Sequence, residues 1–345
     1  MAKLDFYTIE KAEKEAIFNA IATESGMTPF AAEKDWWVSR TLNIIFQMGM
    51  AAHLVFKGGT SLSKAWKLIN RFSEDIDLAI DREFFGFKGD LGKSQRDRLR
   101  KQSGAYVDEV FFKELSAAFL AHGYEQVNVQ LEAVIASDHD RKINIYYSNI
   151  IPSPRYLEPR VQIEISCRSL REPFTPKRFG SLVDEYYADR EFAESLFTVP
   201  TVNPERTFLE KLFLLHEEFH RPSEKMRVDR LSRHLYDIYH LTKAGIADRA
   251  IADKELYEVI VAHRYKFSRV GDVDYNLHHP KNLNPIPVGE KMAEWNADYT
   301  KMMEEMIYEE NKPSFADLIN NLSELRTKLQ AVIWPFELTF PVPKS

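Results

Sequence analysis

The sequence predicts an α+β fold, in which a mixed sheet with flanking helices precedes a C-terminal helical bundle. Short apolar runs of strand length are confined to the first half of the chain, whereas helical spacing dominates from about Asn203 onward. The length of 345 residues also favours two domains, because domains average roughly 150 residues. We therefore expect an α+β domain over residues 1–200 and a helical domain over residues 201–345.

The N-terminal segment is predicted to form two helices, near Glu10–Ser25 and Pro29–Met48. Thr28 is a suitable N-cap for the second helix, because its hydroxyl can accept a bond from a free backbone N–H. Pro29 then occupies the first helical position, where a missing N–H is tolerated.

Strand signals follow these helices. His53–Lys57 is a short apolar run that stops at a Gly-Gly pair, and helical spacing resumes after the glycines. Asp75–Asp81 alternates between polar or small residues and aliphatic ones, which predicts a second strand. After a long predicted helix, the remaining strand-like runs span Val127–Ile135, Lys142–Ile150 and Arg160–Cys167. They favour an antiparallel or mixed sheet.

The second half contains only helical patterns. The predicted helices, including the long one of the first half, span Ser94–Ala121, Pro204–Phe219, Asp229–Lys243, Asp253–Tyr265, Gly289–Tyr308 and Ser314–Val332.

Composition and charge exclude several classes of protein. Hydrophobic residues make up 44% and aromatic residues 12%, which is too apolar for a disordered chain. The single cysteine, Cys167, excludes an internal disulfide and a cysteine-rich zinc site. We see neither a targeting segment nor an apolar run long enough for a membrane, so a cytoplasmic location without membrane contact is expected.

The glycine turn has the properties of an anion site. Gly58 and Gly59 allow backbone N–H groups to approach an anion closely, and the start of the next helix adds a positive dipole end. Thr60 and Ser61 offer hydroxyls to the same anion. A phosphate suits this turn, although many strand-to-helix turns contain Gly-Gly for structural reasons alone.

The Asp-Ile-Asp motif adds a second chemical signal. Side chains alternate along a strand, so Asp75 and Asp77 project to one face while Ile76 and Leu78 pack on the other. Neighbouring carboxylates repel unless a cation lies between them, and oxygen ligands suit Mg²⁺, which also binds substrate phosphates. The alternative is a solvated strand face.

Together these motifs resemble the AbiEii/AbiGii toxin family, which includes the MenT toxins and belongs to the DNA polymerase β-like nucleotidyltransferases. The first motif spans Gly58–Lys64 and the second spans Arg71–Leu78. Phe208–Leu212 resembles the family's third motif and Ser232–Ile238 its fourth. The resemblance implies a polymerase β-like α+β fold whose helical domain completes the active site.

The resemblance also implies roles for individual residues. Asp75, Asp77, Lys211 and Asp237 are the expected catalytic residues, and the expected nucleotide-binding residues are Gly58, Gly59, Thr60, Ser61, Lys64, Arg71, Ser73 and His234. Lys211 lies on the apolar stripe of its predicted helix, so it is either buried at a cost or reaches a pocket. The alternative for Asp237 is a simple intrahelical pair with His234.

A third carboxylate is expected on a later strand. Sites of this superfamily commonly carry one that helps to hold the metal, and Glu164 is the best-placed candidate, since it alternates with buried-face residues in Val161–Cys167. Glu132 is a weaker candidate, and an exposed strand residue is an equal alternative for Glu164. Mg²⁺ (or Mn²⁺) is thus expected at Asp75, Asp77 and Glu164.

The implied function is that of a toxin in a toxin–antitoxin or abortive-infection system. It would transfer NMP from an NTP to an acceptor hydroxyl, by resemblance the 3′ end of tRNA, and would have a cognate antitoxin. A protein or small-molecule acceptor and a non-catalytic nucleotide-binding module are the alternatives. Because the net charge is -6, any RNA contact must use local basic segments, of which Lys88–Lys101 and Arg155–Arg178 are candidates; the alternative for them is an ordinary solvated surface.

Overall fold

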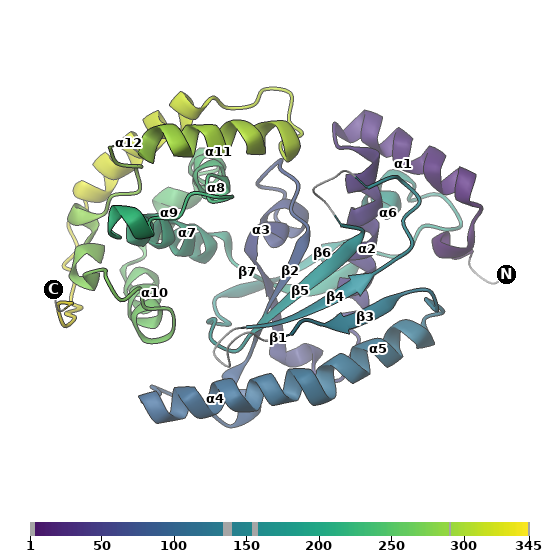
Figure 1. The fold of residues 1–345 in the computed structure, drawn as a ribbon, viewed down its shortest axis with the longest axis horizontal. Helices are drawn as coiled ribbons and strands as arrows, with labels where there is room; N and C mark the ends of the chain where they lie inside the picture. Colours follow the sequence, from purple (N-terminus) through teal and green to yellow (C-terminus); the bar gives the residue numbers. More distant parts are fainter. Residues whose placement is uncertain (1–3, 134–139, 154–157, 290, 344–345) are drawn as a thin grey trace. The chain divides into compact units, whose positions relative to one another are not determined.

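The structure is a computed structural model and describes residues 4–133, 140–153, 158–289 and 291–343 (Figure 1). The chain divides into two compact units. The first unit comprises Met1–Trp66 and Phe72–Val202, and the second comprises Lys67–Arg71 and Asn203–Ser345. Residues 67–71 thus belong with the helical part, although in sequence they lie between two strands of the sheet.

The first unit is built on a mixed sheet, seven-stranded in the described residues, with the order β3-β4-β5-β2-β1-β7-β6 (Figure 1). The pairs β2–β5 and β1–β7 are parallel, and the other neighbours are antiparallel. The strands span Leu54–Lys57 (β1), Asp75–Ile80 (β2), Asn128–Leu131 (β3), Arg141–Tyr146 (β4), Arg160–Ser166 (β5), Phe174–Phe179 (β6) and Phe197–Val202 (β7). This mixed sheet confirms the predicted α+β class.

The helices of this unit cover one face of the sheet. α1 (Lys11–Ser25) packs on α2 (Pro29–Ile45), which in turn contacts β2, β5 and α5 (Phe112–Ala121). α5 also lies along β3 (Figure 1). The predicted N-cap of α2 is confirmed, because the Thr28 hydroxyl accepts a hydrogen bond from the backbone N–H of Ala31.

The hydrophobic core lies between this helical layer and the sheet. Ile76 and Leu78 of β2 are fully buried, as are their neighbours Ile163 of β5 and Ile143 of β4. The opposite sheet face carries Asp75 and Asp77, as the sequence pattern predicted, and beside them a small buried apolar cluster of Val55, Ala79 and Val202.

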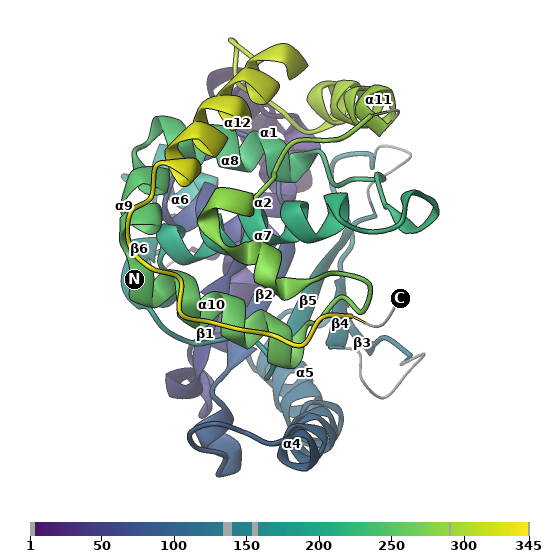
Figure 2. The same ribbon diagram turned by 90° about the vertical axis from the view of Figure 1, so that its left-hand side faces the viewer.

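The second unit is helical and includes residues 67–71, which belong to the strand-rich half of the sequence. Its helices are α7 (Pro204–Phe219), α8 (Arg233–Lys243), α9 (Ile246–Ala252), α10 (Lys254–Phe267), α11 (Lys291–Glu305) and α12 (Phe315–Gln330). α7 packs against α8, α9 and α10, and α12 packs on α8. Figure 2 shows the C-terminal segment alongside α10, where Trp334 stacks edge-on against Tyr257 at a centroid distance of 5.2 Å.

Several predicted elements differ from the observed ones. Strands β6 and β7 were not predicted, because each contains a proline, Pro176 and Pro200, and proline argues against a strand in sequence patterns. In the sheet these two prolines are direct partners in the β6–β7 pair. The short helix α9 was also missed.

The predicted long helix is confirmed with an irregularity in its middle. α4 (Lys93–Tyr106) continues into α5 through a π-helical turn at Val107–Phe111. The predicted strand Val127–Ile135 is observed only over β3, and its last two residues lie outside the described residues. The helix predicted from residue 229 begins at Arg233 instead, since Arg230 has a positive φ of 59°.

Candidate active site

The carboxylates predicted for metal binding gather on neighbouring strands. β2 and β5 are parallel, and their register places Asp77 beside Glu164 and Asp75 beside Gln162. Asp75, Asp77 and Glu164 are half-buried, whereas the residues between the aspartates and after them are fully buried. The alternation expected from the sequence is therefore realised, and Asp77 and Glu164 form a pair across the two central strands.

Electrostatics couple this pair. Burial raises the pKa of Glu164, and the negative charge of Asp77 raises it further. Two lysines on the flanking strands offset the charge: Lys57 Nζ lies 4.0 Å from Asp77 Oδ1, and Lys142 stands opposite Glu164 in the β4–β5 register. Sequence reasoning missed both lysines, because only the strand register brings them to the carboxylates.

The alternative carboxylate, Glu132, lies farther from the pair. Its Oε2 accepts hydrogen bonds from Asn144 at 3.4 Å and from Gln162 at 3.2 Å, and the residue is exposed. It follows β3 at the end of the sheet order and has no register partner on β2. The geometry therefore favours Glu164 over Glu132 as the third carboxylate.

Gly58 lies directly against one of these carboxylates. Its φ is +79°, and a Cβ atom added there would lie 1.9 Å from Asp77 Oδ2 and 2.8 Å from Asp77 Cγ. Any other residue would collide with the carboxylate and strain the backbone. The glycine turn and the Asp-Ile-Asp motif are thus packed together, as the interpretation of both as one site requires.

The turn continues into a short helix, and its hydroxyls bond within the protein. Helix α3 spans Gly58–Thr60, including Gly59, and a π-helical turn follows over Ser61–Ala65. The Thr60 hydroxyl lies 2.9 Å from Ser73 Oγ and donates to the backbone oxygen of Asp75 at 2.5 Å, while Ser61 Oγ donates to the Gly58 oxygen at 2.8 Å. These contacts join the two motifs and hold the turn in shape.

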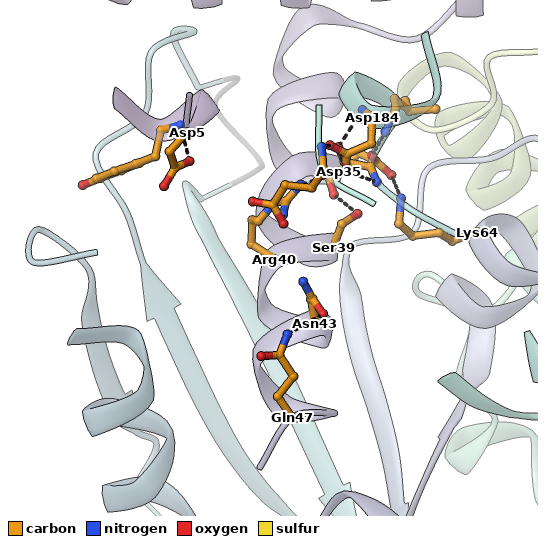
Figure 3. Close-up of polar contacts among 12 residues, drawn as sticks. Asp5, Asp35, Ser39, Arg40, Asn43, Gln47, Lys64 and Asp184 are labelled. Carbon is orange, nitrogen blue, oxygen red and sulfur yellow. Dashed lines mark hydrogen bonds and ion pairs between the residues drawn. The ribbon is translucent and has the colours of Figure 1, made fainter. Parts of the chain in front are cut away.

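Helix α2 supplies charged partners for both motifs. Lys64, predicted to bind nucleotide, forms an ion pair with Asp35, whose second oxygen accepts a bond from Leu182 N at 2.7 Å. Figure 3 shows Lys64 extending toward Asp35. The preceding residue, Lys34, is buried and forms an ion pair with Glu74 of the second motif. Lys34 and Asp35 thus connect α2 to the second and the first motif, respectively.

Farther along α2, Figure 3 shows a second ion pair of the same layer. Arg40 Nη2 lies 2.7 Å from Asp184 Oδ2, and the Asp184 carboxylate also accepts bonds from the backbone and hydroxyl of Ser181. This buried network caps α6 (Leu182–Tyr186), the helix that begins beside Asp35.

The second unit contains a buried triad of charged residues from three predicted motifs. Arg71 donates two hydrogen bonds to Asp237, from Nε to Oδ1 at 2.7 Å and from Nη2 to Oδ2 at 2.9 Å. Lys211 Nζ lies 2.9 Å from Asp237 Oδ2. Asp237 has no exposed surface, so it holds both cations rather than forming the simple intrahelical pair with His234.

Protonation in this triad follows from burial and charge. Burial alone would raise the pKa of Asp237, but the adjacent Arg71 and Lys211 hold it far below its ordinary value. Burial lowers the pKa of Lys211, although Asp237 opposes this effect. His234 Nδ1 lies 3.3 Å from Lys211 Nζ, and burial followed by the lysine charge lowers the pKa of His234, so the imidazole is neutral at pH 7.

The carboxylate pair of Asp77 and Glu164 offers oxygen donors to a divalent cation. Among the described residues, no three His, Cys, Asp or Glu side chains are grouped as they are around a bound metal ion. Asp77 and Glu164 are nonetheless adjacent oxygen donors whose mutual repulsion a cation would relieve. Mg²⁺ keeps several waters and binds through one or two carboxylates plus substrate phosphates, so this donor set fits it.

The predicted basic segments make many local contacts. On α4, Arg100 pairs with Asp97, and the Arg98 guanidinium lies over the Phe87 ring. In the other segment, Arg171 pairs with Asp81, and Lys177 Nζ lies 4.3 Å from the centroid of the Trp66 ring. Arg155 lies outside the described residues.

Comparisons with known proteins place the chain in a class. The family described as "Nucleotidyl transferase AbiEii toxin, Type IV TA system" matches residues 41–321, which is most of the chain. The protein is therefore a nucleotidyltransferase toxin. It belongs to the AbiEii family of type IV toxin–antitoxin systems, and the resemblance predicted from the motifs is confirmed. Membership implies an NTP substrate and a cognate antitoxin.

The solved structures that match this chain share little sequence with it. MenT4, a nucleotidyltransferase toxin from Mycobacterium tuberculosis, is 17% identical with a TM-score of 0.45, and the match covers 94% of this chain and 100% of MenT4. JHP933 from Helicobacter pylori is 12% identical with a TM-score of 0.41, over 86% of this chain and 90% of JHP933. No curated protein matches the sequence. None of the helices in the described part of the chain has the length and apolar character of a membrane span.

Proposed function

We propose that this toxin transfers a nucleoside monophosphate from an NTP to the 3′ end of tRNA, and that it depends on Mg²⁺ or Mn²⁺. The observation that carries the proposal is the contact of Gly58 with Asp77, beside Glu164. It brings an anion-accepting turn and a carboxylate pair into one place, which suits a nucleotide polyphosphate with its cation.

The metal would be held by Asp77 and Glu164, whereas Asp75 stands beside Gln162 and forms no group of three with them among the described residues. When bound, the metal would align the α-phosphate with the acceptor oxygen and neutralise charge on the leaving group. In the reaction, a bond forms between the acceptor hydroxyl oxygen and the α-phosphorus. The bond from the α-phosphorus to the bridging oxygen breaks, and pyrophosphate leaves.

We assign the acceptor proton to the Glu164 carboxylate. The place of Glu164 beside Asp77 in the strand register would put it next to the attacking hydroxyl. Backbone N–H groups of Gly58, Gly59 and the residues that follow would bind the phosphates at the helix start. Thr60 holds this turn through its contacts with Ser73 and the Asp75 backbone oxygen, and Ser61 does so by donating to the Gly58 oxygen.

The charged triad of the second unit contains further residues to which the family resemblance assigns roles with the nucleotide, and we propose those roles here. Lys211 and Arg71 would neutralise phosphate charge, and Asp237 is a positioning residue because it holds both cations. His234, neutral beside Lys211, would contact the nucleotide without adding charge. Lys64 is paired with Asp35, so we propose that it acts through the position of the turn. That the helical part completes the active site stays a prediction.

The biological role proposed is growth arrest during phage infection, reversed by the antitoxin. The test uses purified protein with Mg²⁺, labelled NTPs and total tRNA. Wild type should label RNA at its 3′ end, and Asp77→Asn should reduce labelling by at least a hundredfold. Asp189→Ala, at an exposed position of the first unit, is the matched control and should label normally.

Different outcomes separate the acceptors. If the reaction in a cell lysate labels protein while the tRNA stays unlabelled, the acceptor is a protein. Tight NTP binding with no transfer to any acceptor, together with normal growth on expression, would overturn the enzymatic proposal. Loss of labelling with EDTA and its recovery with Mg²⁺ or Mn²⁺ tests the metal.

A further inference from the structure

Four charged side chains lie in one register row across the centre of the sheet. Glu164 of β5 stands beside Asp77 of β2, and each of the two carboxylates has a lysine on its outer side. Lys57 of β1 is the register partner of Asp77, and Lys142 of β4 is the register partner of Glu164. Register partners share a face of the sheet. The row therefore runs lysine, carboxylate, carboxylate, lysine over the neighbouring strands β4, β5, β2 and β1.

Only one end of this row adjoins the glycine turn. Lys57 directly precedes Gly58, which is in contact with the Asp77 carboxylate. Lys142 lies at the other end, beyond Glu164. Neighbouring strands are about 4.8 Å apart, so the backbones of the two lysines are roughly 14 Å apart across the sheet. The lysines thus lie on opposite sides of the carboxylate pair.

Both ammonium groups keep capacity for hydrogen bonds. Lys57 Nζ lies 4.0 Å from Asp77 Oδ1, which is too far for a hydrogen bond. In the described part of the chain, Lys142 Nζ forms neither a hydrogen bond nor an ion pair of 4.0 Å or less. Each ammonium group carries three N–H donors. Both lysines can therefore bind oxygen atoms of a ligand.

The row is accessible to a ligand, and its charges act on one another. The side chains of Lys57 and Asp77 are 20% and 23% exposed, and Lys142 and Glu164 are half-buried. Burial and Asp77 raise the pKa of Glu164, whereas Lys142 and, to a smaller extent, Lys57 lower it. Without a ligand, the two lysines therefore offset the charge of the two carboxylates.

In-line transfer places the two substrates on opposite sides of the reacting phosphorus, because the attacking and leaving oxygens are roughly in line with it. In the proposed function, the leaving pyrophosphate is bound at the Gly58 turn and Glu164 takes the acceptor proton. The acceptor then approaches from the β4 side of the sheet, where Lys142 lies. A polynucleotide acceptor carries a backbone phosphate close to its terminal hydroxyl, so it brings an anion to that side.

We propose that Lys57 and Lys142 bind different substrates on the two sides of the carboxylate pair. Lys57 binds the β- or γ-phosphate of the NTP, and Lys142 binds the backbone phosphate next to the terminal hydroxyl of an RNA acceptor. This inference rests on the proposed function and deepens it. Lysine suits both positions, because its ammonium group is a compact point charge that binds phosphate oxygens.

A role limited to charge neutralisation predicts a different result. Loss of either lysine would then increase the repulsion between Asp77 and Glu164 and would weaken the binding of both substrates alike. The proposed roles predict instead that each lysine affects one substrate. Each lysine variant therefore serves as a control for the other.

The test compares Lys57→Met and Lys142→Met in the full chain with Mg²⁺. Calorimetry measures binding of ATP, GTP, CTP and UTP, and fluorescence anisotropy measures binding of labelled total tRNA over about 50–200 mM salt. Lys57→Met should weaken NTP binding at least tenfold and change tRNA affinity less than twofold. Lys142→Met should change NTP affinity less than twofold. It should weaken tRNA binding and reduce the slope of log affinity against log salt by about one, as expected for the loss of one phosphate contact.

Conservative variants and a matched control accompany these measurements. Lys57→Arg and Lys142→Arg keep the cation and should recover most of the affinity that the methionine variants lose. Lys113 is an exposed lysine of α5 in the same unit, and Lys113→Met should change neither affinity. Melting temperatures of all variants check that they are folded.

Both affinities are measured without transfer, so they decide the inference even if the wild type labels no tRNA. Labelling of tRNA by the wild type, together with unchanged affinities in both methionine variants, would overturn the inference and leave the proposed function intact. Equal weakening of NTP and tRNA binding by each variant would also overturn it. A wild type that binds no NTP would refute the role of Lys57. An unchanged salt slope in Lys142→Met, or a wild type that labels protein and binds no tRNA, would refute the role of Lys142.

Discussion

Gly58 and Asp77 are in contact across the β1–β2 edge, so closely that a Cβ atom on Gly58 would lie 1.9 Å from Asp77 Oδ2. This relationship makes the first motif part of the carboxylate site rather than a neighbouring turn. It also explains why glycine is needed there for two separate reasons, the left-handed backbone and the lack of space.

Gly58→Ala should abolish transfer, because the new methyl group displaces the Asp77 carboxylate. The matched control is Gly86→Ala, which has the same φ of +79° but no neighbouring atom within 4 Å. Both variants should lose about 1–2 kcal/mol of stability from backbone strain. Only Gly58→Ala should lose activity in the tRNA-labelling assay, and equal activities would contradict the assignment of the turn.

Glu164→Gln should abolish transfer without destabilising the protein at pH 7. The folded-state pKa of Glu164 is raised, so its ionised form disfavours folding, and stability is lost as pH rises from the ordinary value toward the folded one. The neutral amide of the variant removes the repulsion between the Glu164 and Asp77 carboxylates. Melting temperatures at pH 4 and pH 7 should show the advantage of the variant only at pH 7. Glu132→Gln is the control, and a lower melting temperature for Glu164→Gln at pH 7 would refute the repulsion.

Asp237→Asn should destabilise the second unit by about 3–5 kcal/mol, because removing one member of a buried ion pair leaves uncompensated charge. In this variant Arg71 and Lys211 stay buried, but they face a neutral amide instead of the carboxylate with which both pair in the wild type. Urea unfolding measures the loss. The exposed pair of Lys328 with Asp248 provides the control, and Asp248→Asn should cost less than about 1 kcal/mol. Similar losses for both variants would show that the triad is not buried in solution.

The second unit should lose stability in acid through Glu217. Although burial by itself raises the pKa of Glu217, Arg264 lowers it to about 2, from an ordinary value of 4.5. The stabilisation is therefore complete above pH 4.5 and is lost as pH falls toward 2. It amounts to about 3 kcal/mol, at about 1.4 kcal/mol for each pKa difference of one.

Urea unfolding of wild type and Glu217→Gln between pH 6 and pH 2 tests this dependence. The variant should be less stable at pH 6 and should show a flatter decline in acid. Glu304→Gln, at an exposed position of the same unit, should follow the wild-type profile. A parallel decline in wild type and Glu217→Gln would assign the acid sensitivity to other groups.

Much of the fold could be predicted from local patterns. The alternation in Asp75–Asp81 and the spacing in Pro204–Phe219 gave elements that the structure confirms with small changes at their ends. The edge strand Phe174–Phe179 could not be predicted, because its proline is tolerated only through its place in the sheet.

The sequence by itself determined the family, the motif residues and the alternation that puts Asp75 and Asp77 on one face, because these depend on residue identity and on spacing within single elements. Only the tertiary structure decided which partners these residues meet. Arg71 and Asp237 are 166 residues apart, yet they form a bidentate pair. Likewise, strand register placed Asp77 beside Glu164. Such contacts depend on the packing of distant segments, and no local pattern contains that information.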